Sequence, residues 1–138
     1  MSFPPKPHWT GARVAAQWLH QQQRTGQRFE GLAVEIAPQT LMQAYATQDA
    51  FLELLVQNNP SDICGYKIAI TTPAMQSFVG FNDAISGCVL AQSVHASGHA
   101  IEAQQYQHLI VEFELALQLG HDLPHTDQPS RGLRQNNS

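Results

Sequence analysis

The sequence predicts an α+β fold in which N-terminal helices are followed by a mixed or antiparallel β-sheet. Residues 10–59 carry apolar positions at helical spacing, and residues 64–119 carry shorter stretches with strand periodicity. A doubly wound fold would need a helix between successive strands. The sequence pattern at residues 72–87 and 95–108 offers at most one or two helical turns, which argues against a doubly wound fold.

The first predicted helix runs from about Gly11 to Arg24. Thr10 is placed to act as its N-cap residue, and Gly26 is placed to end it. Larger apolar side chains share one face of this helix: Val14, Trp18 and Leu19. We therefore expect an amphipathic helix that packs through these side chains.

The second predicted helix begins after Thr40, which forms a capping-box pattern with Gln43 three residues later. Apolar residues then recur at roughly helical spacing: Leu41, Tyr45, Leu52, Leu55 and Val56. The run Asn58-Asn59-Pro60 breaks this pattern, so the helix should end there.

Strand periodicity begins at Tyr66–Thr71, which is rich in β-branched residues. Tyr66, Ile68 and Ile70 alternate there with Lys67, Ala69 and Thr71. Thr72-Pro73 can start a short helix that reaches Phe78, because proline suits the first helical position. Cys88–Val94 is a second predicted strand, and Gly98 should supply a turn after it.

The last predicted strand, Leu109–Leu119, contains two glutamates inside an apolar run. Glu112 and Glu114 are two residues apart and should project to one side of a strand, while the intervening apolar side chains project to the other. Burial of two carboxylates about 7 Å apart would raise their proton affinity unless a cation compensates, and a hard divalent ion is the simplest compensation. The alternative is an edge strand that exposes its acidic face to water, which is the commoner arrangement for this spacing.

Length and composition favour one globular domain, or part of a larger one, over residues 1–124, followed by a polar, disordered tail at residues 125–138. Hydrophobic residues make up 43% of the 138 residues, which is enough for a core. The formal net charge is −4 and the basic residues are scattered, so a nucleic-acid partner is not expected. The sequence has no apolar run long enough to cross a bilayer and no apolar segment of a secretion signal near Met1, so we expect a cytoplasmic protein without a membrane partner.

The spacing of the cysteines and histidines does not match a zinc-binding motif. Cys64 and Cys88 are 24 positions apart without a C-x-x-C motif, so we expect reduced, buried thiols. His95 and His99 need not share a face, because the intervening residues disfavour a helix, and a surface role is expected rather than zinc ligation. The larger aromatic side chains are expected in the core: Trp18, Tyr45, Phe51 and Phe113.

Several motifs resemble the 2-keto-4-pentenoate hydratase group of the fumarylacetoacetate hydrolase superfamily. They are the segment Gly65–Gln76 (GYKIAITTPAMQ), then Gly87, then Glu112–Leu117 (EFELAL), and then Asp122-Leu123-Pro124. Upstream, Ala44–Phe51 is similar to the helix that precedes the G-x-K-I-x-x-T segment in these enzymes. The motifs occur in the family's order, so the resemblance implies the N-terminal part of a hydrolase-like α+β fold.

The resemblance covers roughly residues 10–124 and implies a metal-dependent lyase. Its substrate would be a small 2-oxo or 2-hydroxydienoic acid from aromatic catabolism, such as 2-hydroxypenta-2,4-dienoate, to which the enzyme adds water. Glu112 and Glu114 match two ligands of a Mg²⁺ or Mn²⁺ ion, and Lys67 matches a catalytic lysine beside the metal and substrate. Family members are about twice as long, so the resemblance implies that the third metal ligand follows Ser138.

Alternatives remain open at these positions. Taken without the family, Lys67 is as compatible with a strand surface as with an active site. Ile85 stands two residues before Gly87, where hydratases usually carry an acidic residue, and nearby Asp83 is not assigned that role. The chain could instead be a 4-oxalocrotonate-type decarboxylase, or an inactive truncated homologue that acts as a binding or subunit-interaction module. Uncovered apolar strands favour self-association as a homo-oligomer or association with a related subunit.

Overall fold

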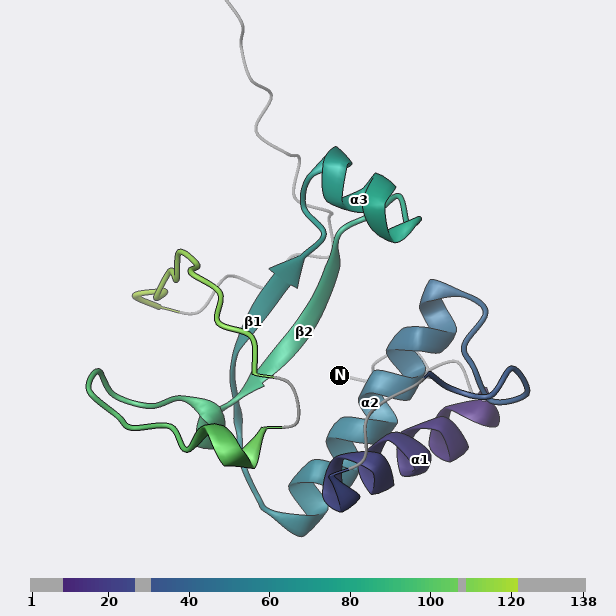
Figure 1. The fold of residues 1–138 in the computed structure, drawn as a ribbon, viewed down its shortest axis with the longest axis horizontal. Helices are drawn as coiled ribbons and strands as arrows, with labels where there is room; N and C mark the ends of the chain where they lie inside the picture. Colours follow the sequence, from purple (N-terminus) through teal and green to yellow (C-terminus); the bar gives the residue numbers. More distant parts are fainter. Residues whose placement is uncertain (1–8, 27–30, 107–108, 122–138) are drawn as a thin grey trace, which may run out of the picture.

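Two helices, a two-stranded antiparallel sheet and a short third helix form an α+β fold, as the sequence predicts (Figure 1). The computed structural model describes residues 9–26, 31–106 and 109–121. The elements are α1 (Gly11–Thr25), α2 (Leu41–Asn58), β1 (Ile63–Ala69), α3 (Pro73–Val79), β2 (Ile85–Leu90), and the 3₁₀ turns η1 (Ala91–Ser93) and η2 (Ala103–Gln105).

The helices α1 and α2 pack side by side through small residues (Figure 1). Ala12, Ala15 and Ala16 are buried, the last two completely, and their short side chains let α2 approach closely. The predicted packing face is wrong at Val14, which is half exposed. Alanines form the tightest part of the contact because a larger side chain there would hold the two helices apart.

The helix ends test the predicted caps. Gly26 ends α1 in a left-handed conformation (φ 68°), as expected, but Thr10 has helical backbone angles and its side chain makes no capping hydrogen bond. At α2, the Thr40 hydroxyl accepts from the backbone N–H of Gln43 at 3.2 Å, as predicted. The Gln43 side chain accepts from the N–H of Gln39 at 2.7 Å, so the reciprocal bond reaches one residue further back than in a standard capping box.

The antiparallel sheet places Lys67 directly opposite Gly87. The strand predicted at Tyr66–Thr71 starts earlier and ends at Ala69, because Ile70 has a left-handed φ of 57° that turns the chain out of β1. The strand predicted at Cys88–Val94 is also displaced. It starts at Ile85 and ends at Leu90, where pairing with the start of β1 runs out and η1 begins.

The short helix α3 follows its predicted signals. The Thr72 hydroxyl accepts from the N–H of Met75 at 3.3 Å, Pro73 occupies the first turn, and Gly80 ends the helix with a φ of 72°. The predicted turn at Gly98 is also present, with a φ of 88°.

The predicted strand at Leu109–Leu119 is wrong: these residues have no regular secondary structure and no strand partner, and every one of them is exposed. Phe113 is 98% exposed, so its predicted core position is wrong as well. A strand requires a neighbouring backbone to accept and donate its hydrogen bonds, and in the described residues β1 pairs with β2 alone.

The core of the described residues is small. Ala12, Ala15, Ala16 and Leu90 are its buried apolar residues, and no large side chain is fully buried in that part of the chain. Few contacts join the helix pair to the sheet; in one of them the Tyr45 hydroxyl accepts from the N–H of Ser86 at 3.1 Å. Across residues 9–26, 31–106 and 109–121, no helix is both long and apolar enough to cross a membrane.

Two sequence predictions lie outside the described residues. They are the polar tail at residues 125–138 and the turn at Asp122-Leu123-Pro124.

Candidate functional site

Lys67, Glu112 and Glu114 come together in the structure. The Lys67 ammonium lies 3.3 Å from Oε2 of Glu112 and 3.4 Å from Oε1 of Glu114. Lys67 is in the middle of β1, and the glutamates belong to a segment more than 40 residues later in the chain. Both carboxylates lie on the side of their segment that faces Lys67, so one ammonium group contacts both.

Lys67 faces a glycine across the sheet. A Cβ atom on this residue, Gly87, would meet no atom closer than the Gln48 side-chain oxygen at 3.8 Å. Directly opposed residues of an antiparallel pair project to the same face, so Gln48 of α2 approaches the face that carries Lys67. Nothing in the sequence assigns Gln48 to this site, because its distance from Gly87 depends on how α2 meets the sheet.

The electrostatics of the cluster favour a charged lysine. Hydrogen bonds to Glu112 and then to Glu114, together with the negative charge of both carboxylates, raise the pKa of Lys67 above its ordinary value of 10.5. The side chains of the three residues are 47%, 64% and 53% exposed, so water and salt screen these ion pairs strongly. The cluster is therefore a surface charge arrangement with a defined geometry, and its effect on folding stability is small.

The donor atoms suit the metal that the resemblance implies, but they are few. Carboxylate oxygens are the ligands that Mg²⁺ and Mn²⁺ prefer, and Glu112 and Glu114 bring two carboxylates to one point. Mg²⁺ requires close to octahedral coordination, and no group of three or more potential ligands from His, Cys, Asp and Glu is found among the described residues. The pair fits such an ion as a partial site, whose remaining positions need water, substrate or an oxygen from outside the described residues.

The acidic residue near Gly87 does not join the cluster through any described contact. The Asp83 carboxylate accepts from the N–H of the next residue, Ala84, at 2.8 Å. Ile85 begins β2 and is paired with Ala69. Neither Asp83 nor Ile85 is therefore seen to add an oxygen ligand for a metal ion held by Glu112 and Glu114.

The sequence leaves open whether His95 and His99 share a face. In the structure their rings stack, with centroids 4.0 Å apart and planes 10° apart. The turn at Gly98 brings them together, since the N–H of His99 donates to the carbonyl of Ala96. Both are exposed, and no third ligand residue accompanies them within the described ranges, which agrees with a surface role.

Both cysteines are free thiols, as expected, but the prediction that both are buried is wrong. Cys64 is exposed and Cys88 is half-buried, because β1 lacks a covering layer in the described part of the chain. The Cys64 thiol lies 3.5 Å from the carbonyl oxygen of Val89 on the neighbouring strand.

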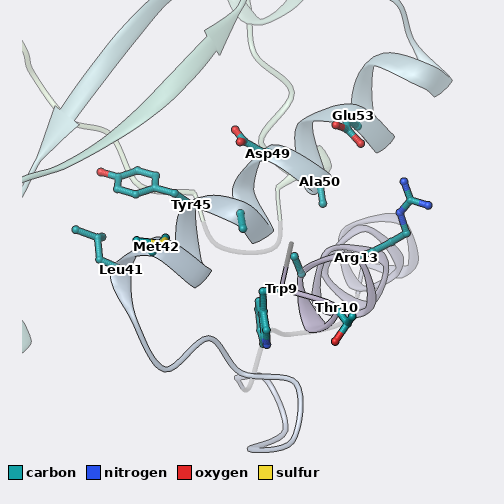
Figure 2. Close-up of a pocket in the computed structure, with 11 residues that line it drawn as sticks. Trp9, Thr10, Arg13, Leu41, Met42, Tyr45, Asp49, Ala50 and Glu53 are labelled. Carbon is teal, nitrogen blue, oxygen red and sulfur yellow. The ribbon is translucent and has the colours of Figure 1, made fainter. Parts of the chain in front are cut away.

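A separate cavity of about 880 Å³ opens between the start of α1 and residues 41–53 of α2 (Figure 2). Its lining is mainly apolar, from Trp9, Leu41, Met42 and alanines of both helices, with a few charged side chains. Figure 2 shows Arg13 on α1 and Glu53 on α2 at one end of this space. None of the three residues of the Lys67 cluster lines the cavity, so the two features are distinct.

Comparison with known proteins adds no relative. No protein-family model matches the chain, and no curated protein matches it. The resemblance to the hydratase group therefore depends on its sequence motifs, and the geometry of Lys67, Glu112 and Glu114 has to be weighed as chemistry.

Proposed function

We propose that this chain carries part of the active site of a metal-dependent hydratase, a carbon–oxygen lyase. Its substrate class would be a 2-oxo or 2-hydroxydienoic acid such as 2-hydroxypenta-2,4-dienoate. The observation that supports this proposal is the convergence of Glu112 and Glu114 on Lys67. These are the three residues that the sequence motifs select, and they come from two segments far apart in the chain.

Each residue has a specific task in this proposal. The two carboxylates hold a Mg²⁺ or Mn²⁺ ion, which supplies Lewis-acid stabilisation of negative charge on the substrate's 2-oxo group. Lys67 places an ammonium group beside the same carboxylates, where it can stabilise negative charge that develops on the substrate during proton transfer. Gly87, opposite Lys67, has no side chain that would crowd the ammonium group.

The present contacts also set a condition for metal binding. The Lys67 ammonium already neutralises part of the charge of Glu112 and Glu114, so a divalent ion has to displace it from at least one carboxylate. Two partly exposed carboxylates bind Mg²⁺ weakly, because this ion gives up its water reluctantly. We therefore expect weak binding in the millimolar range for the chain alone.

The test is a titration with Mn²⁺ at near-physiological ionic strength, in which electron paramagnetic resonance measures the bound ion. The wild-type chain should bind about one ion, and Glu112→Gln and Glu114→Gln should each reduce that binding. Glu102→Gln is the matched control, since Glu102 is an exposed glutamate in no described ion pair and its side chain makes no described hydrogen bond. Equal binding by all four proteins would contradict the proposal.

Activity provides the second readout. Loss of the dienoate's ultraviolet absorbance on adding chain and metal would support a hydratase, whereas release of carbon dioxide from a 4-oxalocrotonate-type substrate would identify a decarboxylase. Metal binding without either reaction would limit the proposal to the ion site.

A second candidate function is a non-catalytic module that binds a related subunit. The observation that favours it is the exposure of Phe113, Leu115 and Leu117, at 98%, 99% and 92%. Co-purification with a related full-length hydratase, with that enzyme's activity unchanged by Glu112→Gln in this chain, would support the module instead of the enzyme.

A further inference from the structure

The segment Leu109–Leu119 has the pattern of a strand but no strand partner. Its odd-numbered residues are all apolar and exposed, from 47% at Leu109 to 99% at Leu115. No backbone hydrogen bond is found for residues 109–121, so the N–H and C=O groups of this described segment are available to another strand.

We propose that Leu109–Leu119 pairs with the same segment of a second copy of the chain, as antiparallel strands related by a two-fold axis at Leu115. A two-fold interface uses the same surface on both partners, so the surface must be self-complementary. Leu109–Leu119 is self-complementary because its odd-numbered residues are apolar. Any antiparallel register centred on one residue places odd-numbered residues of one copy opposite odd-numbered residues of the other. Apolar side chains then meet apolar side chains along the pair.

Charge selects the register. Centring the pair on Phe113 places Glu112 opposite Glu114 of the other copy, and centring it on Glu114 places Glu114 opposite its own counterpart. Like charges directly opposite each other destabilise a strand pair. These two registers are therefore disfavoured.

The register centred on Leu115 avoids this repulsion. Glu112 then lies opposite Gln118, whose amide can donate to it, and Glu114 lies opposite Ala116. The apolar pairs are Val111 with Leu119, Phe113 with Leu117, and Leu115 with its counterpart. A centre at Ala116 also separates the glutamates, but it shortens the overlap within Leu109–Leu119 and leaves Val111 outside it.

Lys67 supports the same arrangement. In the Leu115 register the two copies of Glu114 are diagonal neighbours, about 7–8 Å apart. Each copy's Lys67 lies 3.4 Å from its own Glu114, so the charge on this face is partly neutralised before the copies meet. The Lys67 side chain contacts Glu112 and Glu114, but no described backbone hydrogen bond joins Leu109–Leu119 to β1. Both backbone edges of Leu109–Leu119 are therefore free to pair.

The pairing surface is small compared with a standard interface of about 800 Å² per partner. We therefore expect a reversible dimer whose population rises with protein concentration. Sedimentation velocity of the full chain in EDTA measures this without any metal, so the result is independent of the proposed hydratase function. Phe113→Ser should weaken dimerisation at least tenfold. Phe78→Ser is the matched control, because Phe78 is also a highly exposed phenylalanine, at 85%, but belongs to α3.

Cysteine cross-linking tests the register in a background with Cys64→Ser and Cys88→Ser. Leu115→Cys should form a disulfide-linked dimer on mild oxidation, since residues at the axis are directly opposed and within disulfide range. Val111→Cys should not, because its two copies would lie several residues apart. Leu115 is 99% exposed, so its substitution removes no described packing contact.

The proposal is overturned by a monomer at all concentrations, by equal effects of Phe113→Ser and Phe78→Ser, or by equal cross-linking at positions 111 and 115. A monomer whose amides at residues 109–119 are protected from exchange would show instead that the segment pairs with β1 of its own chain. That outcome also overturns the dimer.

Discussion

The Lys67 ammonium on β1 lies 3.4 Å from the Glu114 carboxylate, and this ion pair joins the sheet to a segment that has no strand partner in the described structure. Glu112 shares the same ammonium group. A single lysine therefore positions both carboxylates of the candidate site, and its charge controls what else can bind there.

The pH dependence of this contact follows from the raised pKa of Lys67. A group whose pKa is higher in the folded chain stabilises that state fully below its unfolded pKa, and the stabilisation is lost as the pH rises through the folded pKa. The contact should thus persist at neutral pH and disappear only above about 10.5. Nuclear magnetic resonance titration of the Lys67 side chain would measure this, and a pKa at or below the ordinary value would contradict it.

Replacing Lys67 should separate metal binding from catalysis. Lys67→Met removes the positive charge that competes with a divalent ion, so Mn²⁺ affinity should increase several-fold while hydratase turnover is lost. Lys67→Arg keeps the charge and should leave the affinity close to wild type. Mn²⁺ titration and the dienoate assay measure the two effects, and weaker binding by Lys67→Met would show that the lysine supports the carboxylates instead of competing for them.

Thr40 should contribute to stability through its cap on α2. Thr40→Ala removes the acceptor for the N–H of Gln43 and should lower the free energy of unfolding by about 1 kcal/mol. Thr10→Ala is a matched control, because the Thr10 side chain makes no capping bond at α1 and its loss should have little effect. Urea unfolding monitored by circular dichroism compares the two variants, and equal effects would contradict the capping assignment.

The contact between α1 and α2 should tolerate no larger side chain at Ala16. Ala16→Leu inserts three carbon atoms into a fully buried position and should destabilise the chain by about 1–3 kcal/mol. The same change at the neighbouring exposed position, Gln17→Leu, should cost far less. Thermal unfolding of both variants tests this, and similar melting temperatures would mean that the helices do not pack as described.

Local sequence signals anticipated much of the fold because the interactions behind them are local. The Thr40 cap, the Asn59-Pro60 stop and the Pro73 start act within one or two helical turns, and α2 and α3 begin and end close to where these residues place them. The strand boundaries were displaced by two to four residues, since they depend on pairing between β1 and β2 and on the turn at Ile70.

In the candidate site, too, the sequence predicted what depends on neighbouring residues and did not predict what depends on distant ones. Alternation in the sequence predicted that Glu112 and Glu114 point to one side, because successive side chains of a strand point in opposite directions, and both carboxylates contact Lys67 in the structure. Whether their segment becomes a strand depends on a partner, and the described residues offer none to Leu109–Leu119.

Residue order thus established the helices, the Thr40 cap of α2 and the shared direction of the two glutamates, all of which follow from interactions between near neighbours. The approach of Lys67 to those glutamates, and the exposure of Phe113 and Leu115, were settled by how distant segments meet in space. Contacts across such separations depend on packing and backbone pairing, which a pattern within one segment does not specify.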